Sequence, residues 1–221
     1  DAVSDLLLTA SPAATAHLER EHAHGRIVFV GDTMLDVVNW ARDVARTRST
    51  ILEKLALAPS SYAIATIHRA ETTDRADTLG AALELLARID RTVILPLHPR
   101  TQAAVERFGL EQLLAAPSLH VIEPLGYLDM VQVVQNARAV LTDSGGLQKE
   151  AFYLGVPCIT LRNETEWVET VEMGWNHVVG LDVAKAREAL EQAAPQSSDA
   201  NPYGAGDAGA RIVDAIEEFL S

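Results

Sequence analysis

The amino-acid sequence predicts an α/β protein built mainly on a doubly wound, Rossmann-like parallel sheet. Short runs of apolar and β-branched residues alternate along the chain with longer segments that have helical spacing. The runs are continuously apolar, as expected for strands that are buried on both faces of a sheet. The 221 residues, 48% of them hydrophobic, are enough for one sizeable domain and part of a second.

The elements follow in order from these runs. Strands are expected where the apolar runs lie, at residues 5–10, 26–30, 62–67, 92–97, 119–122, 138–142, 157–161 and 177–179. Helices are expected in the periodic segments that alternate with them, at residues 12–23, 33–56, 74–89, 101–115, 127–136, 145–154, 182–193 and 207–220. A polar, turn-rich loop is expected at 194–209.

A domain boundary is expected within residues 42–60, where a charged stretch, a helical patch and ALAPSS follow one another. Residues 1–50 then hold only two strands, too few for a sheet of their own. We therefore expect 1–50 to be the remnant of an amino-terminal domain with its linker, and 51–221 to be a Rossmann-like domain. The start at Asp1, without a methionine, is also what a piece of a longer protein would show.

Composition and charge indicate which partners the chain can bind and in which compartment it is expected. The net charge is −13 and no basic stripe is visible, which argues against nucleic-acid binding. No apolar run approaches the roughly 20 residues of a membrane span. Cys158 is the single cysteine and lies in an apolar run, so no disulfide framework is expected and a reducing cytoplasm is the expected location. An anionic ligand must be held by local donors, because the overall charge repels it.

The stretch TDSGGLQKEAFYLGVP, residues 142–157, lies between an expected strand and an expected helix. Ligands of open α/β sheets bind beyond the carboxyl ends of the strands, where Ser144, Gly145 and Gly146 are expected. Glycines allow a close approach of the backbone, and the start of the helix offers free N–H groups to a phosphate. Glu150 follows roughly 9 Å along the helix axis, at an offset that suits the ribose of the same nucleotide. In the alternative interpretation, which spacing leaves open, Ser144 is a helix cap and Glu150 lies on a solvated face.

Two further strand ends carry groups that can bind phosphate. His68 and Arg69 follow the strand YAIAT, and Glu71 can orient one of them. His98 and Arg100 occupy the same place in LHPRT, residues 97–101. Three such ends make a ligand-binding crevice the favoured interpretation over isolated structural histidines.

Several motifs together resemble the carboxyl-terminal half of the non-hydrolysing UDP-N-acetylglucosamine 2-epimerases. They are HRAETTD, HPRT, EPLGY, LTDSGGLQKEA, GVPCITLRNETEWVETVEMGWN and NPYGAGDA, in that order along the chain. The resemblance implies a GT-B-type fold of two domains with a UDP-sugar bound between them. It also implies an isomerase of cell-surface polysaccharide biosynthesis that interconverts UDP-GlcNAc and UDP-ManNAc. The reaction eliminates UDP to a glucal intermediate and then adds it back.

The family's site residues transfer to matching positions of this chain. The resemblance implies that His68, Ser144, Gly145 and Gly146 contact the diphosphate, with Arg69 beside them, and that Glu150 binds the ribose. It places the uracil against Pro124, Leu125 and Met130, where Met130 stands in for an aromatic residue of some relatives. His68 is the candidate catalytic residue, since it can stabilise the departing UDP. No cofactor and no metal are implied.

Three alternatives to this epimerase remain open. Trp167 stands where some members have an arginine, which leaves a UDP-diacetamido sugar acid as an alternative substrate. The family's catalytic carboxylates belong to its amino-terminal domain, so the chain alone is expected to be inactive or to be a non-catalytic UDP-sugar binding module. A GT-B glycosyltransferase is the third alternative.

The aspartates of this chain are expected to have structural roles. Asp143 is expected to orient its own turn, and Asp32 and Asp36 to set a bend and a helix start. The implied partners are UDP or a UDP-sugar, the amino-terminal domain and a second copy of the chain in a homodimer.

Overall fold

The chain divides into two compact units in the computed structural model, which describes residues 3–192, 194–195 and 201–221. Unit 1 comprises Asp1–Asp43 and Ser197–Ser221, and unit 2 comprises Val44–Gln196. No helix within the described ranges is both long enough and apolar enough to cross a membrane.

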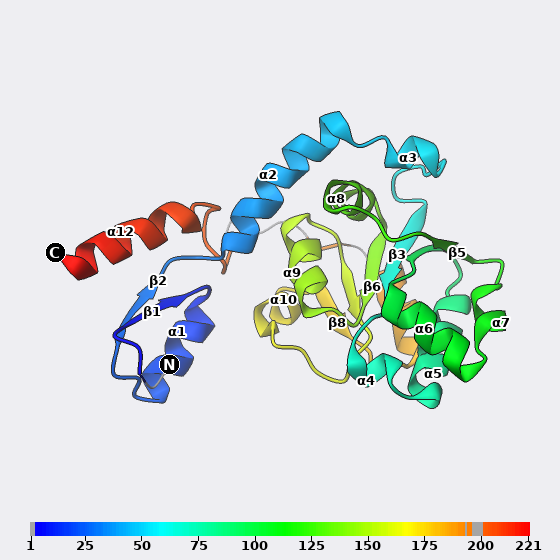
Figure 1. Ribbon diagram of the computed structural model, residues 1–221, viewed down its shortest axis with the longest axis horizontal. Coiled ribbons are helices and arrows are strands. Elements are labelled where there is room, and N and C mark those ends of the chain that lie inside the picture. The colour runs from blue at the N-terminus through cyan, green and yellow to red at the C-terminus, as the bar shows by residue number, and fades with distance from the viewer. Residues whose placement is uncertain (1–2, 193, 196–200) are drawn as a thin grey trace. The chain divides into compact units, whose positions relative to one another are not determined.

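Unit 2 is built on a six-stranded sheet in the order β5-β4-β3-β6-β7-β8, in which all neighbours are parallel (Figure 1). Its strands are β3 Tyr62–Thr66, β4 Thr92–Pro96, β5 Leu119–Ile122, β6 Ala139–Thr142, β7 Cys158–Thr160 and β8 Asn176–Val178. From β3 the chain builds outward to β5, and from β6 it builds outward in the other direction to β8. The strand order therefore reverses between β3 and β6, which is the place where open α/β sheets bind ligands.

Helices cover both faces of this sheet, as the continuously apolar strands require (Figure 1). One face packs against α3 Ile51–Lys54, α8 Tyr127–Gln135 and α9 Gly145–Tyr153. The other face packs against α5 Ala76–Ala87, α6 Pro99–Phe108, α7 Glu111–Leu114 and α11 Val183–Glu191. Alternate residues of one strand enter the two cores, so Tyr62 and Ile64 face α8 and α9 while Ala63 and Ala65 face α5. Cys158 lies in the first of these cores and is 1% exposed.

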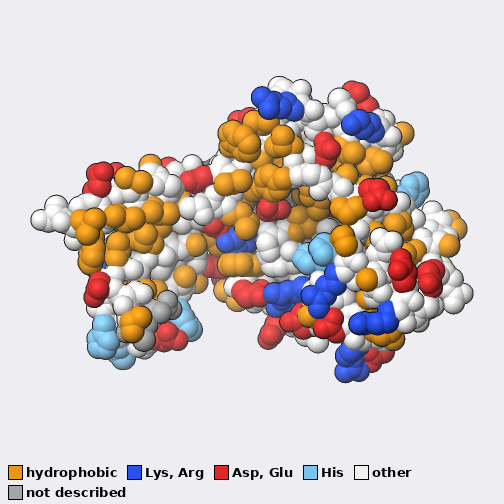
Figure 2. Space-filling model, in the orientation of Figure 1, with side chains coloured by type: hydrophobic (Ala, Val, Ile, Leu, Met, Phe, Trp, Pro, Cys, Tyr) orange, Lys and Arg blue, Asp and Glu red, His pale blue; other side chains and the backbone are white. Residues whose placement is uncertain are grey.

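Unit 1 contains a parallel pair of strands, β1 Leu6–Thr9 and β2 Arg26–Phe29, joined by α1 Pro12–Arg20. Helix α2 Thr33–Arg48 begins in this unit, and α12 Ala208–Leu220 closes the chain. Apolar side chains gather on the exposed side of α12 (Figure 2), among them Val213, Ile216, Phe219 and Leu220.

The carboxyl-terminal helix belongs to unit 1, whereas the sequence groups it with residues 51–221. The carboxylate of Asp36 accepts hydrogen bonds from the N–H groups of Ala208 (3.1 Å) and Gly209 (2.8 Å). Arg211 also donates to the carbonyl of Phe29 at 2.8 Å. Asp36 therefore caps the start of α12, since the first N–H groups of a helix lack partners within it. Asp32 has the role expected of it, because its carboxylate accepts from Met34 N (2.8 Å) at the start of α2.

All eight expected strands are present, within one or two residues at each end. The expected helix at 33–56 is two helices, because Ser49 accepts from Ile51 N (3.3 Å) and donates to Asp129 (2.5 Å) where α2 ends. The expected helix at 101–115 ends at Gly109, which has φ +67° and separates α6 from α7. Two short helices were not expected, α4 Ala70–Thr73 and α10 Val168–Glu172. Part of the expected loop at 194–209 lies outside the described residues.

Candidate functional site

The candidate site lies where the carboxyl ends of β3 and β6 meet. Thr66 and Thr142 are register partners at these ends, and their hydroxyl oxygens are 2.6 Å apart. Beyond Thr66 the chain turns at His68 and Arg69, and beyond Thr142 it enters α9. The two turns that the sequence singled out are therefore direct neighbours.

Asp143 connects these two turns. Its carboxylate is fully buried and accepts hydrogen bonds from His68 N (3.1 Å) and Arg69 N (3.0 Å). The sequence predicts that Asp143 orients its own turn, and this is wrong: it orients the turn after β3. A buried carboxylate needs such donors, because burial of an unpaired charge is costly. The neighbouring strand end supplies them.

The first turn of α9 forms the second wall of the site. Ser144 is the N-cap, its N–H donates to Thr142 Oγ1 at 2.9 Å, and its own hydroxyl oxygen accepts from Leu147 N at 3.4 Å. Gly145 and Gly146 are the first two helical residues. The N–H groups at the start of this nine-residue helix, together with the helix dipole, suit an anion. The helix-cap alternative is thus correct for Ser144, and it does not exclude a ligand there.

Histidines from two strand ends lie together. The His68 and His98 rings are stacked with their centroids 5.3 Å apart, and His68 Nδ1 lies 4.0 Å from Asp143 Oδ1. The His68 side chain is 36% exposed. Arg100 does not join them, because its guanidinium donates to Thr73 Oγ1 (2.9 Å) and Asp74 Oδ1 (2.8 Å) at the start of the neighbouring loop.

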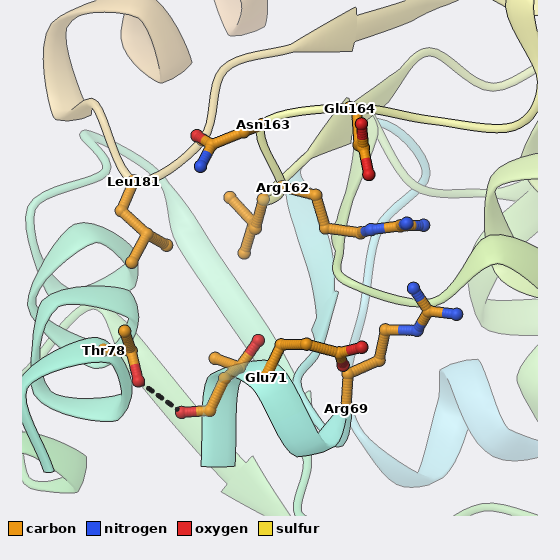
Figure 3. A pocket seen from close by; sticks show the side chains of 10 residues that line it. Arg69, Glu71, Thr78, Arg162, Asn163, Glu164 and Leu181 are labelled. Atoms are coloured by element: carbon orange, nitrogen blue, oxygen red, sulfur yellow. Dashed lines mark hydrogen bonds between the residues drawn. The ribbon is translucent and has the colours of Figure 1, made fainter. Parts of the chain in front are cut away.

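Arg69 lines a hollow of about 280 Å³ beside these turns (Figure 3). The guanidinium groups of Arg69 and Arg162 lie on the same side of it, and Glu71 lies below them. Glu166 pairs with both guanidinium groups, at 2.9 Å from Arg162 and 3.9 Å from Arg69. This pairing holds the pKa of the Glu166 carboxyl below its usual range. Arg69 is therefore held at the edge of the site, with a third of its side chain exposed.

Glu150 lies half-buried on α9 and contacts Tyr127 of α8. Burial raises the pKa of the Glu150 carboxyl, while a hydrogen bond from the Tyr127 hydroxyl lowers it. Burial, followed by the charge of Glu150, raises the pKa of Tyr127 to about 12. Glu150 is thus not on a fully solvated face, and the segment 124–130 comes close to it through Tyr127. In that segment Pro124 is exposed, whereas Leu125 and Met130 pack partly against the core.

The structure brings together the predicted residues at the ends of β3 and β6, and Tyr127 connects the segment 124–130 to Glu150. Their roles in binding stay predictions. Sequence reasoning missed two neighbours of the α9 turn, Gln148 and Lys149, which are 0% and 5% exposed. Residue spacing does not predict that these two polar side chains are buried, because they follow a glycine turn at the start of a helix. Within the described ranges, no three histidine, cysteine or acidic side chains lie close enough together to hold a metal ion.

Comparison with known proteins gives a consistent result. A family model described as UDP-N-acetylglucosamine 2-epimerase matches residues 1–217. A UDP-N-acetylglucosamine 2-epimerase homolog from Methanococcus maripaludis is 38% identical over 222 residues, which cover 99% of this chain and 62% of that protein. A UDP-2,3-diacetamido-2,3-dideoxy-D-glucuronate 2-epimerase from Pseudomonas aeruginosa is 39% identical over 231 residues, which cover 99% of this chain and 61% of that protein.

A solved structure supports the same conclusion about the fold. The crystal structure of Methanocaldococcus jannaschii UDP-GlcNAc 2-epimerase in complex with UDP-GlcNAc and UDP matches with a TM-score of 0.85 and 33% identity. The match covers 97% of this chain and 61% of that one. The predicted fold class is confirmed, and the chain spans about three fifths of the length of these relatives.

Proposed function

Because the chain belongs to the UDP-N-acetylglucosamine 2-epimerase family, we propose that it forms the UDP-binding part of an enzyme that interconverts UDP-GlcNAc and UDP-ManNAc. One observation carries this proposal. The buried carboxylate of Asp143 connects the His68–Arg69 turn to the start of α9, at the reversal of strand order between β3 and β6. This arrangement supports the binding of an anionic nucleotide.

The parts of UDP have distinct proposed contacts. The diphosphate lies at the N–H groups of Ser144, Gly145 and Gly146, with His68 and Arg69 opposite. The carboxylate of Glu150 accepts from the two ribose hydroxyls, because two adjacent hydroxyls are natural donors to one carboxylate. The uracil packs against a surface formed by Pro124, Leu125 and Met130, in which a methionine side chain can pack against a ring.

In the proposed reaction the C2 proton and UDP are eliminated from the sugar to leave a glucal. UDP then adds back to C1, while C2 is protonated on the opposite face. His68 donates to the departing diphosphate and so stabilises its charge. The base that removes the C2 proton, and the acid that assists, come from the family's amino-terminal domain, which we propose as a partner of this chain. We also propose a homodimer, and a cytoplasmic location that keeps Cys158 reduced.

A related substrate is the second candidate. The relative from Pseudomonas aeruginosa is named for a UDP-diacetamido sugar acid and is 39% identical to this chain. Trp167, which lies against the α9 turn, replaces the arginine of some family members. Both observations favour a UDP-2,3-diacetamido sugar acid as the alternative to UDP-GlcNAc.

Calorimetric titration of the chain with UDP, with and without a chelator, tests the binding proposal. We expect UDP to bind in both conditions, since the proposed contacts are all made by protein donors and acceptors. Uridine and CDP serve as matched controls for the diphosphate and the base. No heat of binding with UDP would contradict the proposed site, and binding that disappears with the chelator would contradict metal-free binding.

A further inference from the structure

The loop that follows β7 contacts the first turn of α9 at three points. The indole N–H of Trp167 donates to the carbonyl of Gly145 at 2.8 Å. The hydroxyl of Thr165 donates to Gln148 Oε1 at 2.6 Å. The Lys149 ammonium lies 4.1 Å from the centroid of the Trp167 ring. One short loop thus touches three of the first five residues of the helix.

This loop is itself held from the other side. Trp167 N donates to Thr165 Oγ1 at 3.2 Å, and the Trp167 carbonyl accepts from Thr170 Oγ1 at 2.7 Å. The buried side chain of Asn176 on β8 donates to Gln148 Oε1 (3.0 Å) and to Thr170 Oγ1 (3.2 Å). The indole is therefore fixed by contacts that begin in the sheet, and its position is set independently of any ligand.

The hydrogen bond to Gly145 has a specific effect on the donors of the turn. The Gly145 carbonyl belongs to the same planar peptide unit as the N–H of Gly146. An indole that fixes this carbonyl therefore fixes the direction of that N–H. The constraint matters here because two consecutive glycines have more conformational freedom than other residues. Acceptance of a hydrogen bond at the carbonyl also polarises the peptide and strengthens its N–H as a donor.

We propose that Trp167 is a positioning residue for the diphosphate, acting through the Gly145–Gly146 peptide, and not a residue that contacts the nucleoside. The inference rests on the proposed function, because it assumes that the α9 turn binds a diphosphate. It also assigns a role to a tryptophan at a position where some family members have an arginine.

The test compares UDP and uridine binding in the Trp167→Phe variant, which retains an aromatic ring but lacks the N–H donor. Loss of one neutral hydrogen bond in the turn should weaken UDP binding roughly fivefold. Uridine binding should be unchanged, since Glu150 and segment 124–130 are not touched. Trp40→Phe is the matched control, because Trp40 is 61% exposed on α2, and it should change neither affinity.

The outcomes separate this inference from the proposed function. If the unmodified chain does not bind UDP, the proposed function fails. If it binds UDP and Trp167→Phe binds it equally well, or if UDP and uridine weaken equally, the positioning role is overturned. A merely structural tryptophan would lower thermal stability and both affinities together.

A second measurement does not depend on folding of the Trp167 variant. The chain has three tryptophans, so its indole N–H groups give three NMR signals. Trp40→Phe and Trp175→Phe assign the third signal to Trp167. We expect this signal to exchange slowly with solvent and to shift with UDP but not with uridine. Fast exchange, or a shift of equal size with both ligands, would overturn the inference.

Discussion

Glu150 combines partial burial with a raised pKa, and both have consequences for ligand binding. A buried carboxylate that is ionised gains from any donor that replaces lost water. Tyr127 supplies one donor in the absence of ligand, and a ribose diol would supply two more.

Substitution of Glu150 by glutamine should weaken UDP binding about tenfold or more. A hydrogen bond to a charged group contributes about 1.5–3 kcal/mol, and 1.4 kcal/mol corresponds to a factor of ten. Thermal stability should stay equal or rise slightly at neutral pH, since the variant has no buried carboxylate to desolvate. Calorimetry and thermal unfolding measure the two quantities, with Glu84→Gln on the exposed side of α5 as the control. An unchanged UDP affinity would contradict the ribose assignment.

The raised pKa of Glu150 also predicts how pH affects binding and stability. The folded state holds this proton more tightly than the unfolded state, so the Glu150 contribution to stability falls as pH rises above its ordinary value of about 4.5. Binding should show the opposite trend, because the diol needs the ionised carboxylate. We expect uridine affinity to fall as pH is lowered through the raised pKa, and the dependence to flatten in Glu150→Gln. Uridine is the ligand of choice because it has no phosphate to titrate. A profile that is equally steep in both proteins would assign the titration to another group.

Asp143 is the residue whose loss should affect folding most directly within the site. Asp143→Asn keeps the shape but replaces a charged acceptor of the His68 and Arg69 N–H groups by a neutral one. We expect the free energy of unfolding to fall by about 2 kcal/mol. Denaturant titration measures it, and Asp77→Asn, which removes an exposed ion pair with Arg75, should have a much smaller effect, because solvent screens exposed pairs. An equal loss of unfolding free energy in the two variants would show that the hydrogen bonds of Asp143 stabilise the fold no more than an exposed ion pair does.

Residue types could be assigned to the site from the sequence, but their partners could not. Positions that follow strand ends and glycines can be identified from the sequence alone, and these include His68, Ser144 and Glu150. The link from Asp143 to the next strand, the capping of α12 by Asp36 and the contact of Trp167 with Gly145 each join residues far apart in the chain. Local patterns carry no record of such contacts.

At the level of elements, strands were easier to predict than helix ends. Each strand of the sheet is a short apolar run with clear limits, and buried parallel strands give the strongest such signal. The helix break at Ser49 depends on two hydrogen bonds of one side chain, and the break at Gly109 depends on one left-handed residue. The short helix α10, which packs against β8, has five residues and is too short to show an amphipathic period in the sequence.

The edge strand β8 is connected to α9 through the side chain of Asn176. Its amide bonds to Gln148, Thr160 and Thr170, and it is 2% exposed. Asn176→Ala should lower the free energy of unfolding by about 3 kcal/mol, because it leaves buried polar partners unsatisfied. The exposed Asn163→Ala is the control for denaturant titration. A loss below about 1 kcal/mol would indicate that the network re-forms around the cavity.

For the whole molecule, the groups proposed to bind UDP and the groups proposed to transfer protons belong to different domains. The net charge of −13 leaves phosphate binding to the local donors of the β3 and β6 ends. Every residue of the proposed UDP site lies in unit 2, and the proposed acid and base lie in the amino-terminal domain of the family.

The chain by itself should therefore not exchange the C2 proton of UDP-GlcNAc. Proton transfer requires a base within hydrogen-bond reach of the sugar, and the proposed contacts of unit 2 are to the nucleotide. NMR in deuterated buffer follows the C2 signal, with a full-length family member as the positive control. Exchange catalysed by the chain alone would place an acid or base within these residues.

Cys158 offers a practical route to observing the two units in solution. Burial raises the pKa of its thiol to about 12 and leaves it 1% exposed, so a maleimide dye should not react with it. Introduced cysteines should therefore be labelled selectively, without removal of Cys158. Cysteines introduced at the exposed positions Gln102 of unit 2 and Ser221 of unit 1 would accept a donor and an acceptor fluorophore. Energy transfer between them would then report the separation of the units before and after a nucleotide is added.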